Sequence, residues 1–196
     1  MSKSVEKRLD AQKKPAKPKF ERFRTEEGTV SGFISDAHAE ITSLGEEFRE
    51  IVDNAPDSLR ESDVNTRRDG TASACEGLNE PDCSNDILGE LSCSTSLDMG
   101  KVYRGRQTQS RACRAGNAGS MFNAAADAVR QWVEDFPVVD EDSTKQEKKD
   151  HAAMLEANDW SADDFAEAHD QADQLISECE DCAGEIENME WPGMFG

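Results

Sequence analysis

The sequence predicts a mainly α-helical protein, an irregular small helical bundle with long loops and a disordered basic N-terminal arm. Three observations favour this class. Apolar residues recur at spacings of three and four along several segments, the periodicity of an amphipathic helix. Gly, Ser, Asn, Thr and Asp interrupt the chain between these segments. Lysines and prolines fill its start, where proline removes helical hydrogen bonds. We therefore expect a disordered basic arm over 1–28 and an acidic helical domain over 29–196.

The first helix is expected to begin at Ser31, whose hydroxyl can cap an unpaired backbone N–H, and to end before Pro56. Its apolar face holds Ile34, Ala37, Ile41, Leu44, Phe48 and Ile51, and acidic residues occupy its other faces. A second helix is predicted from about Asn117 to Phe136. Trp132 and Phe136 contribute most of its apolar surface.

The longest predicted helix runs from about Ser161 to Met189. One unbroken series of spacings of three and four gives it four heptads on a single seam, the pattern of a coiled coil. A weaker helix over Thr144–Asn158 precedes it. We predict that the apolar seams of the three main helices dock another helix, from this chain or from a partner. The predicted partner-binding residues are Ile41, Leu44, Phe48, Trp132, Phe136, Phe165, Leu175 and Ile186.

Residues 57–116 are predicted to form a loop-rich segment. Only Ile87, Leu88 and Leu91 indicate a helical turn, and Val102 and Tyr103 could begin a short strand that lacks a visible partner. Irregular stretches of this length are uncommon in compact domains. Leu, Ile, Val and Phe together provide only 32 of 196 residues, so we do not expect a single large core.

The net charge of −20 is divided unevenly along the chain. Residues 1–24 carry +6 and residues 99–126 carry +5, whereas 25–98 carry −14 and 127–196 carry −17. The basic island within the acidic body consists of Lys101, Arg104, Arg106, Arg111 and Arg114. We expect it to neutralise acidic helices, with nucleic-acid contact as the alternative. We do not otherwise expect nucleic acid to bind, except through the basic N-terminal arm.

The six cysteines are Cys75, Cys83, Cys93, Cys113, Cys179 and Cys182. Cys179 and Cys182 form a C-x-x-C pair, which can bind zinc when two further ligands are available. Both lie on the predicted heptad seam, where cysteine acts as a small apolar residue, and acidic neighbours raise the pKa of a thiol. We therefore favour buried reduced thiols, with no metal and no cofactor, over a zinc site.

No catalytic motif is present. The chain contains no H-E-x-x-H, no G-x-S-x-G and no phosphate-binding glycine loop, and carboxylate pairs are too abundant to single out a catalytic one. The histidines His38, His151 and His169 are expected on the surface. The sequence predicts a non-enzymatic protein. No apolar run approaches the ~20 residues of a membrane span, and we expect a cytoplasmic location without membrane contact.

The functional prediction is a non-catalytic acidic adaptor or assembly module that binds a protein partner or itself. The alternative is a mimic of nucleic acid that inhibits a DNA- or RNA-binding enzyme through a row of carboxylates. The predicted acidic face consists of Asp163, Asp170, Glu178, Asp181 and Glu185. A third explanation, a surface adapted to high salt, has no special support from the balance of lysine and arginine.

Overall fold

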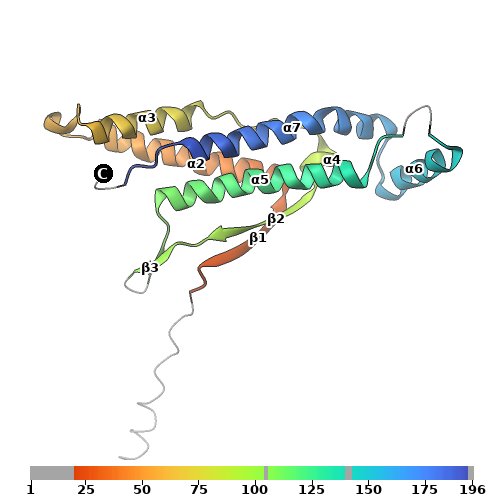
Figure 1. Cartoon of the computed structure of the whole chain (residues 1–196), viewed down its shortest axis with the longest axis horizontal. Coiled ribbons are helices and arrows are strands. Elements are labelled where there is room, and N and C mark those ends of the chain that lie inside the picture. The colour runs from red at the N-terminus through yellow and green to blue at the C-terminus, as the bar shows by residue number, and fades with distance from the viewer. Residues whose placement is uncertain (1–19, 104–105, 140–142, 194–196) are drawn as a thin grey trace, which may run out of the picture.

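The computed structural model of the protein describes residues 20–103, 106–139 and 143–193. It confirms the mainly helical class (Figure 1). In chain order the elements are β1 (Phe23–Thr29), α2 (Val30–Asp53), the 3-10 turn η1 (Asp57–Leu59), α3 (Asp63–Gly77), α4 (Asp86–Gly89), β2 (Ser92–Asp98), β3 (Lys101–Tyr103), β4 (Arg106–Thr108), α5 (Arg111–Asp135), α6 (Lys145–Asn158) and α7 (Ala162–Asn188).

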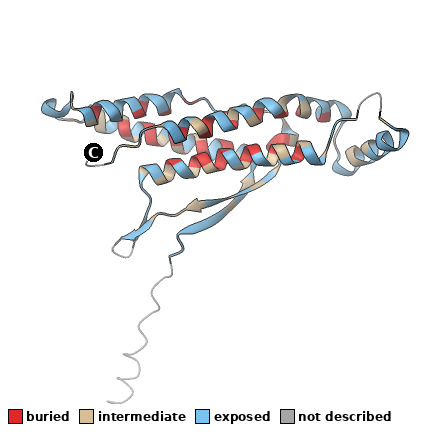
Figure 2. Cartoon of the chain, viewed as in Figure 1, coloured by how far each residue is buried: buried red, intermediate tan, exposed pale blue. Residues whose placement is uncertain are grey.

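Four long helices form the body of the molecule. Helix α7 packs along α5, α5 along α2 and α2 along α3, while the short α4 touches both α2 and α7 (Figure 1). Their facing sides are buried and their outer sides are exposed (Figure 2). Strand β2 lies against α5, so the two-stranded sheet of β1 and β2 lies beside the bundle.

One continuous apolar core joins these helices, contrary to the expectation from the low content of large aliphatic residues. Alanine makes up for the small number of large aliphatic residues, because its short side chain lets helix backbones approach closely and form a core. The buried alanines include Ala37, Ala72, Ala115, Ala118, Ala125, Ala126, Ala168, Ala172 and Ala183. Phe122 and Ile34 are among the largest side chains that this core encloses fully.

The helix boundaries match the predictions for α6 and α7 and differ at two N-termini. Ser161 caps α7 and Thr144 caps α6 within a capping box. Helix α2 is capped by Thr29 rather than Ser31, whose hydroxyl instead donates to the Gly89 carbonyl at 2.9 Å. Helix α5 begins at Arg111, capped by Ser110, well before the predicted start near Asn117. Two arginines of the basic island thus lie on a helix.

The segment 57–116, predicted to be rich in loops, contains α3, α4, β2, β3, β4 and the start of α5. Helix α3 was not predicted, because its buried residues are small or polar: Asn65, Thr71, Ala72 and Cys75. These residues produce no apolar periodicity. The predicted short strand at Val102 and Tyr103 is present as β3, and β4 is its partner.

The N-terminal arm was predicted to be disordered over residues 1–28. Residues 1–19 of that range lie outside the described residues. Phe23–Gly28 belong to β1, which pairs antiparallel with β2 from Phe23↔Asp98 to Thr29↔Ser92. The strand was missed because its exposed face carries no apolar series, so the alternation that marks a half-buried strand is weak.

The histidines are half-buried rather than on the surface, because each packs against neighbouring elements. The His169 ring lies 4.6 Å from Trp132 and 4.7 Å from Phe165, and its Nε2–H donates to the Phe136 carbonyl at 2.6 Å. His151 meets the edge of Phe165 at 5.0 Å. His38 Nε2 hydrogen-bonds with the Leu78 carbonyl at 3.1 Å.

Candidate functional site

The predicted partner-binding seam lies inside the molecule. Ile41, Leu44 and Phe48 are fully buried, and Trp132, Phe165, Leu175 and Ile186 are almost fully buried. Phe136 is half-buried and packs against the same core. The heptad pattern correctly marked these residues as helix contacts, but their partners are the other helices of this chain. Of the two expected occupants of the seams, a helix of this chain or one of a partner, the structure shows the first, and the buried residues are not exposed to a partner.

The predicted acidic face of α7 is interrupted at its centre. Asp163, Asp170, Asp181 and Glu185 are exposed. Glu178 is half-buried, and its carboxylate accepts hydrogen bonds from the Asp82 backbone N–H at 3.1 Å and from Gln174 at 2.8 Å. Of the five predicted residues, four are thus exposed, and the fifth is a carboxylate that is engaged within the fold.

The basic island divides into two parts with different surroundings. Arg111 pairs with Glu47 at 2.8 Å, and Arg114 bridges Glu40 and Glu47. Burial disfavours the charged Glu47 carboxylate, but hydrogen bonds and charge attraction from both arginines together lower its pKa. These two arginines therefore neutralise α2, as expected. Lys101 and Arg106 lie instead on the exposed β3–β4 hairpin, and Arg104 lies outside the described residues.

The C-x-x-C thiols are buried, as predicted. Burial raises the pKa of Cys179 to about 12 and that of Cys182 to about 11. None of the six cysteines forms a disulfide in the structure. Within the described ranges, no group of three or more His, Cys, Asp or Glu side chains could hold a metal ion.

The free edge of strand β2 is the feature that the sequence analysis did not find. Just outside the two ends of the ladder, the N–H of Val30 donates to the Leu91 carbonyl at 2.9 Å and that of Met99 to the Arg22 carbonyl at 2.6 Å. Hydrogen-bonded pairs alternate with non-bonded pairs in an antiparallel ladder. These two hydrogen bonds and the strand register together show which residues of β2 bond to β1. The backbone groups of Cys93, Thr95 and Leu97 point toward β1 and pair with it.

The backbone groups of the alternate β2 residues therefore point away from β1. These residues are Ser92, Ser94, Ser96 and Asp98. Asn117 of α5 occupies the edge at Asp98 as a neighbouring strand would: its Oδ1 accepts from the Asp98 N–H at 2.8 Å and its Nδ2 donates to the Asp98 carbonyl at 3.0 Å. Among the described residues, no such partner meets the backbone of Ser92, Ser94 or Ser96.

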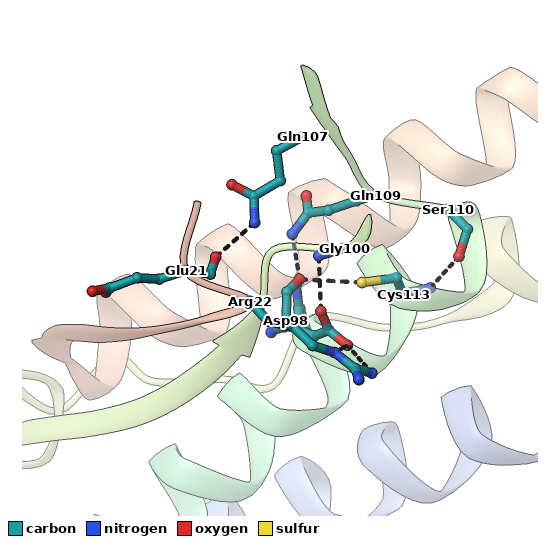
Figure 3. Close-up of polar contacts among 9 residues, drawn as sticks. Glu21, Arg22, Asp98, Gly100, Gln107, Gln109, Ser110 and Cys113 are labelled. Atoms are coloured by element: carbon teal, nitrogen blue, oxygen red, sulfur yellow. Dashed lines mark hydrogen bonds and ion pairs between the residues drawn. The ribbon is translucent and has the colours of Figure 1, made fainter. Parts of the chain in front are cut away.

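Asp98 closes this edge at one end and also fixes the neighbouring hairpin (Figure 3). Its carbonyl additionally accepts from Gln109 Nε2 at 2.6 Å and from the Cys113 thiol at 3.1 Å. Its carboxylate accepts from the Gly100 N–H at 2.8 Å and from Arg22 at 3.1 Å. The Gly100 hydrogen bond, with help from Arg22, lowers the pKa of Asp98. We call this set of contacts the Asp98 junction.

A groove of about 490 Å³ lies between the free edge of β2 and α5. We call it the edge groove. It is lined by Ser92, Cys93, Ser94, Thr95, Ser120, Asn123, Ala124, Asp127 and Ala128. The small side chains of Ala124 and Ala128 leave space in the groove. The hydroxyl and amide groups of its serines, Thr95 and Asn123 can form hydrogen bonds with a ligand. The arrangement can accept an extended chain that hydrogen-bonds to β2 and rests its side chains on α5.

No family model, no curated protein and no solved structure matches this chain. None of the helices in the described part of the chain is long and apolar enough to cross a membrane. The edge groove could have been suspected from the sequence S-C-S-T-S-L at 92–97, an uncharged run in a strongly acidic chain. Its position beside α5 required the fold.

Proposed function

We propose that the protein is a non-catalytic protein-binding module that accepts an extended segment of a partner as a new strand on the edge of β2. The observation that supports this proposal is the contrast along one edge of β2. Asn117 satisfies the backbone of Asp98, whereas the backbone groups of Ser92 and Ser94, which line the edge groove, have no such partner among the described residues. Strand addition uses main-chain hydrogen bonds for affinity and alternate side chains for specificity.

The expected partner segment carries lysine or arginine. Asp127 lines the edge groove and Glu27 is exposed on β1 beside Ser94, in a protein whose net charge is −20. A cationic segment is drawn to this surface, and its association rate falls as salt increases. Small side chains are expected at alternate positions of the segment, because those positions face α5 across Ala124 and Ala128.

A pair of proline variants tests strand addition. The Ser94 N–H points away from β1, so Ser94→Pro removes a donor from the free edge while leaving the β1–β2 ladder intact. Thr95→Pro removes an N–H that belongs to the ladder and should disrupt the sheet. Random peptides displayed on phage would be selected on the full chain, and binding of individual synthetic peptides measured by fluorescence anisotropy.

We expect selected cationic peptides to lose at least about tenfold in affinity for Ser94→Pro, which forfeits one main-chain hydrogen bond and its geometry. Ala124→Trp, which fills the edge groove, should have a similar effect without altering the edge itself. Far-ultraviolet circular dichroism would confirm that both variants remain folded. Peptides that bind the wild type and both variants equally would contradict the proposal.

Mimicry of nucleic acid is the alternative function. It would rest on the exposed carboxylates Asp163, Asp170, Asp181 and Glu185, and the engaged Glu178 divides this set. It predicts that duplex DNA competes with the partner of this protein and that changing Asp181 and Glu185 to the corresponding amides weakens binding. Strand addition predicts that the same two changes leave binding by selected peptides within about threefold, because α7 does not line the edge groove.

A further inference from the structure

The β3–β4 hairpin is held in place by contacts at its base. Gly100 begins the turn into β3 with φ of +76°, and a Cβ at this position would lie 2.0 Å from the Thr108 carbonyl oxygen. Only glycine avoids both the left-handed strain and this overlap. Within the Asp98 junction, the Gly100 N–H donates to the Asp98 carboxylate. Gln107 Nε2 donates to the Glu21 carbonyl at 2.7 Å (Figure 3).

The strand register separates the two faces of this hairpin. Lys101 pairs with Thr108, Val102 with Gln107, and Tyr103 with Arg106. Cross-strand partners share a face and neighbouring residues alternate between faces. Because Gln107 reaches the chain at Glu21, the face of Val102 and Gln107 turns toward the N-terminal segment. The opposite face presents Lys101, Tyr103 and Arg106, and we call it the hairpin face.

The hairpin face is cationic and aromatic in a strongly acidic protein. Tyr103 is 65% exposed, and both cations are exposed. Over the described ranges, neither Lys101 nor Arg106 forms an ion pair, in contrast to Arg111 and Arg114 on α5. Residues 99–126 contain no acidic side chain, and the carboxylate of Asp98 just before them accepts hydrogen bonds from the Gly100 N–H and from Arg22.

We propose that the hairpin face binds single-stranded nucleic acid, with an unpaired base stacked on Tyr103 and the flanking phosphates held by Lys101 and Arg106. Aromatic side chains beside cations form the usual platform for unpaired bases, because every base has a flat face and every nucleotide a phosphate. A duplex keeps its bases stacked inside and offers none to Tyr103. The proposal stands independently of strand addition at β2.

The position of the hairpin makes this binding compatible with a net charge of −20. The β3 strand lies beyond the end of the β1–β2 sheet, away from the helices α3 and α7 (Figure 1). Charges on a protein surface are screened over a distance of about 8–10 Å at moderate salt. The acidic helices therefore repel a strand at the hairpin much less than one lying along the bundle.

Fluorescence anisotropy with a labelled oligothymidine, measured on the full chain at about 50 mM and about 200 mM salt, tests the proposal. Tyr103→Ala should weaken binding roughly tenfold, in the range expected for one stacked base. Tyr103→Phe keeps the aromatic ring and should bind with the affinity of the wild type. Changing Lys101 and Arg106 together to glutamine should reduce the slope of log affinity against log salt by about 1.4. Lys145 and Lys149 changed to glutamine on α6 provide the charge-matched control, which should bind like the wild type.

Three results would overturn the proposal. The first is failure of the wild-type chain to bind the oligonucleotide at about 50 mM salt. The second is equal binding of oligothymidine and polyglutamate by wild type and Tyr103→Ala, which would show attraction to any polyanion. The third is concentration-dependent self-association that is abolished by the Lys101 and Arg106 changes, which would assign the hairpin face to the acidic surface of a second copy.

Discussion

At the scale of single residues, Asp98 and Asn117 determine where the edge of β2 ends. The side-chain amide of Asn117 replaces one residue of a missing strand, and the Asp98 carboxylate ties Gly100 and Arg22 to the same point. Polar side chains thus determine which part of the edge is closed and which part stays open.

Asp98→Asn should lower the melting temperature at neutral pH, because the amide keeps an acceptor for Gly100 but loses the charge that attracts Arg22. The folded-state pKa of Asp98 is lowered. Its contribution to stability is therefore present above the unfolded-state pKa of about 3.9 and is lost as the pH falls through the folded-state value. Thermal denaturation of both proteins between pH 7 and pH ~3 should show the difference shrinking toward zero. A difference independent of pH would contradict this assignment.

Arg114→Leu should destabilise the protein by about 1–2 kcal/mol, because it leaves Glu40 and Glu47 partly buried without their shared cation. The matched control is Arg130→Leu, which removes more exposed pairs with Asp127 and Glu180. Its effect should stay within about 0.5 kcal/mol. Urea unfolding measures the free energy of both variants, and equal losses would contradict the larger contribution assigned to Arg114.

Apolar periodicity predicted the helices that carry large buried side chains and missed the elements that do not. Helices α2 and α7 were predicted closely because residues such as Ile41 and Leu175 mark one face. Helix α3 was missed because Ala72 and Cys75 mark it weakly, and β2 because serines occupy its outer face. The edge groove lies between β2, which was missed, and the part of α5 that was predicted, so the sequence indicated its composition but not its existence.

At the scale of elements, α2 and α3 approach each other closely at Gly45. A Cβ there would lie 2.8 Å from the Cys75 Cβ of α3, which requires the two helices to move apart. Gly116 on α5 is exposed, with no atom within 4 Å of its ideal Cβ position. The two glycines occupy helix interiors with opposite surroundings, so the same substitution should have opposite effects.

Gly45→Ala should destabilise the protein, because overpacking costs about 1–3 kcal/mol and the gain in helix propensity is at most about 1 kcal/mol. Gly116→Ala should stabilise it by about 0.5–1 kcal/mol, because only the propensity changes. Chemical denaturation of the two variants gives the comparison directly. Stabilisation by Gly45→Ala would mean that α2 and α3 are packed less closely than described.

At the scale of the whole molecule, the long heptad of α7 serves the internal core of the bundle. Leu175 is 2% exposed, and Leu175→Ala should cost about 2–5 kcal/mol through lost burial and the cavity left behind. The loss should appear in the isolated chain and should not depend on protein concentration. A loss of stability that depends on protein concentration would indicate that the α7 seam forms a contact between molecules.

At this scale, the helices carry the apolar core, and the β1–β2 sheet lies beside them with one face exposed. Apart from Leu78, the buried apolar residues lie on the helices, and the exposed face of the β1–β2 sheet carries Thr25, Glu27, Ser94 and Ser96. Binding at β2 should therefore leave the helices unchanged. The central claim is that the backbone of this strand is open on one side.

Amide hydrogen exchange on the full chain, resolved residue by residue by NMR, tests that claim most directly. The structure predicts slow exchange at Cys93, Thr95 and Leu97 and fast exchange at Ser94 and Ser96 in the free protein. Addition of a selected cationic peptide should make the Ser94 and Ser96 amides slow. Protection of these two amides before any peptide is added, or fast exchange that persists when the peptide is bound, would contradict strand addition at β2.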